Sequence, residues 1–144
     1  MKILLINEEV ENWQDAIRKT SKKLYDEGFV NDEFGNQCIE REKKYPTGLN
    51  TLAPIAIPHT DSDFVHESAI CLLKPRNKVS FVSMEDSSTK IEVNYILNLA
   101  IKDNKQQVPV LSKVIGLFND TDLINHVNEK GSTVLKAIIE KEFN

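Results

Sequence analysis

The strongest constraint on the fold is a short apolar run closed by proline and histidine, Ala53-Pro54-Ile55-Ala56-Ile57-Pro58-His59-Thr60. An apolar stretch of this length that ends at a turn residue predicts a buried strand. Proline has no N–H to donate to a sheet, so Pro58 should stop the pairing. His59 then follows a strand end at the rim of a sheet, where ligand and catalytic groups gather in open α/β folds.

Spacing alone leaves two interpretations of His59 open, a turn histidine at a strand end or a reactive group. Histidine changes charge near neutral pH, and its ring nitrogen is a competent nucleophile. A metal-dependent hydrolase would have to use His59 with Asp61 and Asp63, which is too small a ligand set for a dedicated metal site. We therefore expect no metal and no cofactor. His66 and His126 belong to no motif; His126 is expected at the surface and His66 in the loop before the strand 68–73.

Length and charge restrict the classes of protein that remain. A chain of 144 residues is enough for one domain with a full core. A net charge of −4 disfavours general binding to nucleic acid or anionic membranes. Cys38 and Cys71 have neither a metal-type spacing nor a disulfide framework, and they are expected to pack as small hydrophobic groups. With no secretory signal at the N-terminus, cytoplasmic residence with reduced thiols is expected.

The first third of the chain is predicted to be helical. Trp13, Ile17, Leu24 and Tyr25 recur at helical spacing, and Gly28 suits the end of that helix. A second helix follows, capped by Asn31 or Asp32, with Cys38 and Ile39 at loosely helical spacing. The segment Pro46-Thr47-Gly48 closes it with turn chemistry.

The middle of the chain is predicted to form a sheet, and the last third returns to helix. The expected strands are 55–58, 68–73, 79–82 and 91–101, the last a central strand although its pattern also allows a helix. Helices are expected over 108–118, after a cap at Asn119 or Asp120, and from Gly131 onward. This order predicts an α/β (α+β) fold: residues 1–144 form a single domain, with a mixed central sheet flanked by helices on both faces.

A charged block before the histidine strand, Glu40-Arg41-Glu42-Lys43, also has two interpretations. It is typical of a solvated helix end with opposed charges. Arg41 could instead bind a phosphate, because a guanidinium fork matches phosphate oxygens. Thr47 and the Gly48 backbone could add hydrogen bonds to the same group.

Taken in order, Arg41-Glu42, Pro46-Thr47-Gly48-Leu49 and Ile55-Ala56-Ile57-Pro58-His59 resemble one known family. The chain is similar to the IIA component of the bacterial sugar phosphotransferase system, of the fructose/mannitol superfamily. Within it, the galactitol-type proteins show similar runs at Val79-Ser80-Phe81 with Met84 and at Leu99 to Asp103. The recognisable motifs extend from about Glu40 to Phe118.

The resemblance implies a phosphoryl carrier. The phosphocarrier protein HPr would bring a phosphohistidine, His59 would take the phosphoryl group, and a cysteine of the IIB component would receive it, with the IIC permease involved indirectly. Arg41 matches the arginine near the phosphate, and Thr47 is a candidate for binding the phosphate or supporting the site. The hypothesis requires the His59 ring to be exposed at the edge of the fold, within a fairly apolar partner surface. The alternative is a regulatory module in which the same histidine is a switch.

One segment departs from the mannitol and fructose types. Those members carry a second histidine after the long strand, whereas here Gln106 or Gln107 occupies the place. Galactitol-type members tend to show glutamine there. A glutamine amide can donate a hydrogen bond to phosphate but carries no charge, so Arg41 is left as the clearest nearby cation.

Overall fold

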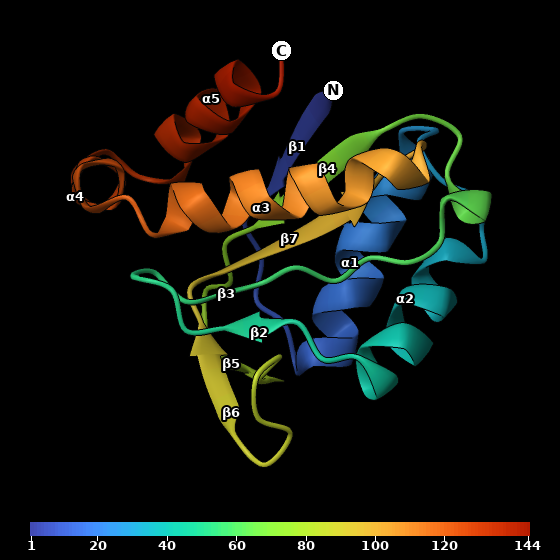
Figure 1. Cartoon of the computed structure of the whole chain (residues 1–144), viewed down its shortest axis with the longest axis horizontal. Coiled ribbons are helices and arrows are strands. Elements are labelled where there is room, and N and C mark those ends of the chain that lie inside the picture. The colour runs from blue at the N-terminus through green and yellow to red at the C-terminus, as the bar shows by residue number, and fades with distance from the viewer.

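The computed structural model describes all residues, Met1–Asn144, as a mixed sheet between two layers of helices, with a separate hairpin (Figure 1). The main sheet has the strand order β1-β4-β7-β3-β2, and β5 pairs with β6. The strands are β1 (Lys2–Ile6), β2 (Gly48–Leu49), β3 (Ile55–Ala56), β4 (Ala69–Leu73), β5 (Val79–Val82), β6 (Lys90–Val93) and β7 (Tyr95–Ala100). The helices are α1 (Trp13–Asp26), α2 (Phe34–Lys44), α3 (Gln107–Phe118), α4 (Thr121–Lys130) and α5 (Ser132–Glu142), with 3₁₀ turns at Ser62–Phe64 and Asn104–Gln106.

The interior strand β4 shows why helices cover both faces of the sheet. All five of its residues are buried, since Ala69, Cys71 and Leu73 contact the core under α1 and α2 while Ile70 and Leu72 contact the core under α3, α4 and α5. Successive side chains of a strand point to opposite faces, so a continuous apolar run needs a layer on each side. The expected fold class is therefore confirmed.

Cap residues set most of the predicted helix ends. Asn12 caps α1 through its side chain, and Gly28 follows that helix with φ of +86°, a conformation that glycine adopts at no steric cost. Of the alternatives left open, the Asn31 side chain accepts from the backbone at the start of α2, and Asp120 caps α4. Tyr25 was expected on the buried face of α1, but it is half exposed.

Three predictions about strands were wrong or incomplete. The segment 91–101 is two strands, because the Asn94 N–H bonds the Pro54 carbonyl and turns the chain from the hairpin into the main sheet. The first residues form β1, a strand that the sequence analysis did not assign; its parallel partner β4 lies more than sixty residues away. Gly48 was expected in a turn, but it begins β2.

The apolar layer under α1 contains a small buried polar network, centred on the side chain of Asn98. This residue is fully buried on β7, and its Nδ2 donates to the hydroxyls of Thr20 and Ser21, both at 3.0 Å. The Thr20 hydroxyl donates in turn to the Ala16 carbonyl. Because every member has a partner, this network fixes how α1 lies on the sheet. None of the five α-helices has the length and apolar character needed to cross a bilayer.

Replacing Asn98 by alanine is expected to lower the free energy of unfolding by about 2–3 kcal/mol. The substitution removes two buried hydrogen bonds and leaves a small cavity. Urea denaturation measures the change, and Asn94→Ala is the matched control because the Asn94 side chain is exposed. Equal stability of the two variants would contradict a stabilising role for the network.

Candidate functional site

His59 is fixed where two parallel strands end. The Leu99 N–H donates to the Pro58 carbonyl at 3.0 Å, and His59 forms a single parallel bridge with Leu99. Regular pairing of β3 stops at Ala56, as Pro58 suggested, and this one bridge ties the next residues to β7. The side chain therefore sits on backbone that is held from one side by the central sheet.

The expected exposure of the His59 ring was wrong. The residue is only 8% exposed, because packed neighbours cover the segment after β3. The two ring nitrogens differ in their surroundings. Nδ1 bonds the Ile57 carbonyl, Nε2 has no hydrogen-bond partner, and no fully buried side-chain nitrogen or oxygen in the chain lacks a partner. Nε2 is therefore not fully enclosed, and it is the ring nitrogen that is left free of a hydrogen bond.

The tautomer of His59 follows from its one hydrogen bond. Nδ1 lies 2.8 Å from the Ile57 carbonyl oxygen, and a carbonyl can only accept, so Nδ1 carries the hydrogen. Burial lowers the pKa of His59 below its usual 6.5; the Ile57 bond opposes that shift, and the charge of Arg41 adds to it. At neutral pH the ring is neutral, with the lone pair on Nε2.

A buried carboxylate lies behind the histidine. Glu42 is 5% exposed, and it accepts hydrogen bonds from the Thr47 N–H at 2.7 Å and the Thr47 hydroxyl at 2.8 Å. The Ile57 N–H donates to that hydroxyl at 3.1 Å. Burial raises the pKa of Glu42 to about 7, while the two Thr47 bonds and Arg41 oppose the rise. The solvated interpretation of this helix end was therefore wrong for Glu42.

Arg41 is an unpaired cation of this region, as is Lys44 on the same turn of α2. Arg41 is exposed on the last turn of α2, and its guanidinium lies 5.2 Å from the centre of the Tyr45 ring. It forms no ion pair, since none of the salt bridges in the structure includes it. Its charge lowers the pKa of both His59 and Glu42, which places it within electrostatic range of the site.

The structure separates the two glutamines. The Gln107 side chain donates to the Thr60 carbonyl at 3.2 Å, which puts its amide beside the residue after His59. Gln106 instead borders a cavity near the chain termini, together with Met1 and Phe143. Thr47 is close to the histidine, but its hydroxyl is already engaged by Glu42 and Ile57, so it is not free to bind a phosphate.

The remaining candidates lie elsewhere. His66 and His126 are exposed, and Cys38 and Cys71 are buried free thiols, as expected. Asp61 accepts from the Asp63 N–H in a local turn. No three His, Cys, Asp or Glu side chains gather as a metal-binding group.

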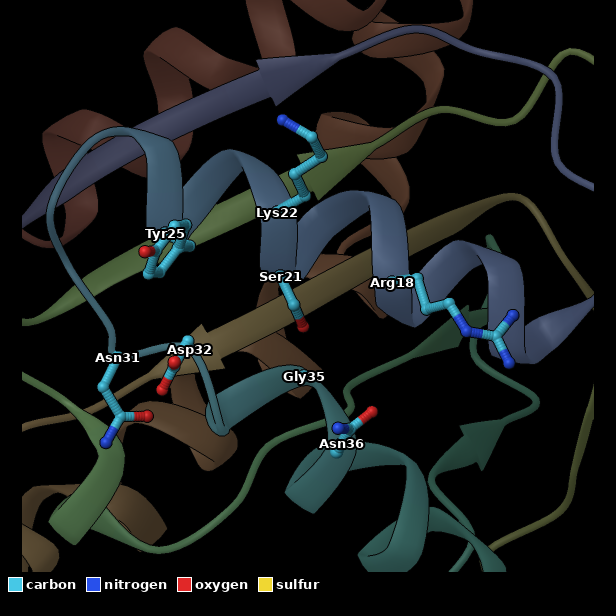
Figure 2. Close-up of a pocket in the computed structure, with 8 residues that line it drawn as sticks. All are labelled: Arg18, Ser21, Lys22, Tyr25, Asn31, Asp32, Gly35 and Asn36. Carbon is cyan, nitrogen blue, oxygen red and sulfur yellow. The ribbon is translucent and has the colours of Figure 1, made fainter.

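A cavity between α1 and α2 does not include the histidine. Figure 2 shows that Lys22 and Arg18 point away from its centre, so its polar groups do not converge on a ligand.

Sequence reasoning did not assign two groups of the candidate site, the Glu42 carboxylate and the particular carbonyl, that of Ile57, that bonds the second ring nitrogen. Glu42 stands in a run of charged residues, where hydrophilicity hides its burial. A backbone carbonyl has no sequence signal. The sequence signal that could have indicated them is the order of a glutamate, a threonine and then the histidine strand. The fold brings these three parts together through β2 and β3.

Comparison with known proteins identifies the family. The sequence profile of the family described as "Phosphoenolpyruvate-dependent sugar phosphotransferase system, EIIA 2" matches residues 2–142. The chain is 28% identical over 128 residues to the "PTS system galactitol-specific EIIA component" of Escherichia coli (strain K12), covering 88% of this chain and 85% of the relative. It is 28% identical over 142 residues to the "Mannitol-specific phosphotransferase enzyme IIA component" of Geobacillus stearothermophilus, covering 96% and 87%.

A solved structure shows the same fold. The complex of enzyme IIA and phosphorylated enzyme IIB for mannitol from Escherichia coli contains a chain that superposes with a TM-score of 0.69 at 22% identity, covering 88% of this chain and 84% of that one. The protein therefore belongs to the EIIA 2 family. It is a phosphoryl-carrying component of a sugar phosphotransferase system, of a kind that is phosphorylated on histidine.

The raised pKa of Glu42 predicts a pH-dependent contribution to stability. Between 4.5, the unperturbed value, and about 7 the folded state holds a proton that the unfolded state has lost, so stability falls as the pH rises through this window. Relative to Glu42→Gln, the wild-type protein should lose roughly 3 kcal/mol of unfolding free energy from pH 4.5 to 8. Denaturant unfolding of both proteins across this range measures the difference, and a constant difference would contradict the buried carboxylate.

Proposed function

We propose that Nε2 of His59 accepts a phosphoryl group from the phosphohistidine of HPr and passes it to a cysteine of a IIB component. In the first step the Nε2–P bond forms while the N–P bond of the donor breaks. In the second a thiolate attacks phosphorus and the Nε2–P bond breaks. The observation that carries the proposal is the engaged Nδ1 beside an Nε2 that is free of a hydrogen bond and not fully enclosed. Transfer of this kind depends mainly on positioning and charge stabilisation.

Arg41 and Gln107 are proposed to serve the phosphoryl group. Phosphorylation of Nε2 brings about two negative charges to a mostly buried ring, which is costly without a counter-charge. Arg41 has no acidic partner to lose, so its guanidinium can turn to the phosphate oxygens. The Gln107 amide donates to the Thr60 carbonyl and, at 3.4 Å, to Asn104 Oδ1, so it can add a neutral hydrogen bond to the phosphoryl group when it releases the longer of the two.

The proposed docking surface for HPr and IIB is formed by exposed apolar side chains on segments that surround the histidine. Tyr45 stacks with Arg41, Met84 follows the strand that meets β2, and Val108 follows Gln107. Each is 45% or more exposed, so each can contact a partner protein. The mannitol IIA of Escherichia coli was solved in complex with its phosphorylated IIB, which supports a IIB partner for this chain as well.

The same proposal includes the transported substrate and the location of the protein in the cell. The galactitol-specific and mannitol-specific relatives support uptake of a sugar alcohol, galactitol-like, through a IIC permease that this chain does not itself contact. Residues 1–144 act as one IIA domain in the cytoplasm, where HPr is found. The names of these relatives favour transport over the regulatory alternative.

Replacing His59 by alanine should abolish phosphorylation by phospho-HPr, because no other ring nitrogen occupies the site. The label in the wild-type protein should be acid-labile and base-stable, and mass mapping should place it on His59. His66→Ala and His126→Ala are matched controls, since both histidines are exposed and lie outside the site. Undiminished labelling of His59→Ala would overturn the assignment.

Arg41→Ala should slow phosphoryl transfer from phospho-HPr by about 100-fold, the usual loss when one preorganised charge-stabilising donor is removed. Arg41→Lys should recover only part of the rate, because an ammonium group lacks the guanidinium fork. Rapid-quench kinetics measure both. Lys43→Ala, on the same helical turn and exposed, is the control; if it slowed transfer as much as Arg41→Ala, the effect would be one of general charge.

A further inference from the structure

Hydrogen bonds and the backbone of Ile57 together join Glu42 to His59. The Glu42 carboxylate accepts from the Thr47 hydroxyl at 2.8 Å, and that hydroxyl accepts from the Ile57 N–H at 3.1 Å. The carbonyl of the same isoleucine accepts from His59 Nδ1 at 2.8 Å. Three residues, the most distant 17 positions earlier in the sequence, thus act on one ring nitrogen of His59.

We propose that Glu42 is a positioning residue for phosphoryl transfer, because its carboxylate orients Thr47 and thereby fixes the Ile57 carbonyl that selects the Nδ1–H tautomer of His59. This inference rests on the proposed function of His59. It assigns to the carboxylate no contact with the phosphoryl group.

The geometry around Thr47 explains why a carboxylate is needed. Glu42 accepts both the N–H and the hydroxyl of Thr47, one on each oxygen, so the backbone and the side chain of that residue are both fixed. Since the hydroxyl proton is committed to Glu42, only a lone pair remains, and the Ile57 N–H uses it. An amide in place of the carboxylate would present an NH₂ group to one of these two donors. One of the hydrogen bonds that Glu42 accepts from Thr47 would then be lost.

Ile57 and Pro58 limit how far a displacement of Thr47 can spread along the backbone. Pro58 has a fixed φ and donates no hydrogen bond, and its carbonyl is held by the Leu99 N–H at 3.0 Å. Ile57 is fully buried and held at its N–H by Thr47. The carbonyl of Ile57 thus lies between two anchored points, and releasing Thr47 would free one of them.

Solvent protons can reach Glu42 through a cavity beside it. The cavity lies between the end of α2, the start of α1 and the β5–β6 hairpin, and Trp13, Phe81, Val82 and Ser87 line it without any charge. Arg41 and Cys38 interact electrostatically with Glu42, and Lys43 lines the same cavity; all three lie on its own helix, while His59 is linked to it through Thr47 and Ile57. The pKa of about 7 at Glu42 therefore makes its orienting charge sensitive to pH near neutrality.

The first test measures the His59 tautomer by ¹⁵N NMR of the ring nitrogens, without any partner protein. In the wild type at pH 8, the two nitrogens should show the well-separated shifts of an Nδ1–H tautomer. Glu42→Gln and Thr47→Val should bring the two shifts together, because the second tautomer becomes populated. Thr47→Ser is the matched control, since it keeps the hydroxyl and should keep the wild-type shifts. Wild-type shifts in folded Thr47→Val would overturn the inference.

The second test is the rate of phosphorylation by phospho-HPr between pH 6 and 9. Glu42→Gln and Thr47→Val should be about tenfold slower at pH 8, a typical loss when a group that orients a reactive side chain is removed. The ratio of wild-type to Glu42→Gln rates should rise as the pH passes through 7, where Glu42 ionises. Dividing the two rates cancels the titration of His59 and of the donor. A ratio that stays at one would overturn the proposal.

The outcomes separate this inference from the proposed function. If His59 of the wild type takes no phosphoryl group, the proposed function fails, whereas the NMR test still decides the role of Glu42. If His59 is phosphorylated at equal rates in wild type and variants, only the positioning role fails. Should Glu42→Gln unfold, the wild-type tautomer ratio measured across pH 7 tests the same link, and a ratio unchanged by pH would count against it.

Discussion

The structure depends on one short hydrogen bond, between His59 Nδ1 and the carbonyl two residues earlier. The bond selects a tautomer and leaves a single nitrogen free of a hydrogen bond. It can form only if the segment after β3 is bent and held, which Pro58 and the bond from Leu99 achieve. A carrier that receives and gives the same group needs little covalent help from its surroundings, so fixing the direction of one lone pair is a large part of its task.

Burial has opposite effects on the two titratable groups of the site. It lowers the pKa of His59, because the charged ring loses hydration, and it raises the pKa of Glu42 for the same reason. Near pH 7 the first shift keeps His59 neutral, while the second leaves Glu42 close to half ionised. Arg41 remains an uncompensated charge at the surface, so the site is prepared for an anion before one arrives.

Local signals predicted the histidine strand and most helices correctly, since apolar runs, proline and cap residues act over a few positions. Asn12 and Asp120 are caps whose partners lie three residues away. The prediction failed where the deciding partner is distant. The sequence around Glu42 is hydrophilic, but the fold buries this residue against Thr47. The segment 91–101 has the pattern of one strand, but the hydrogen bond from the Asn94 N–H to the Pro54 carbonyl divides it into two. Which of the two glutamines lies near His59 depends on the turn before α3. Sequence spacing could not distinguish Gln106 from Gln107.

Gly48 shows how a packing constraint supports the chemistry. A Cβ at this position would lie 2.7 Å from the Val82 carbonyl oxygen, so only glycine lets β2 approach the hairpin this closely. That approach lets the Met84 N–H donate to the Gly48 carbonyl, and this bond fixes the backbone directly after Thr47. The sequence Thr47-Gly48 therefore combines a polar side chain that orients the histidine segment with a residue that has no side chain to keep the strands apart. A larger residue at 48 would move Thr47, and the displacement would pass through Ile57 to the ring.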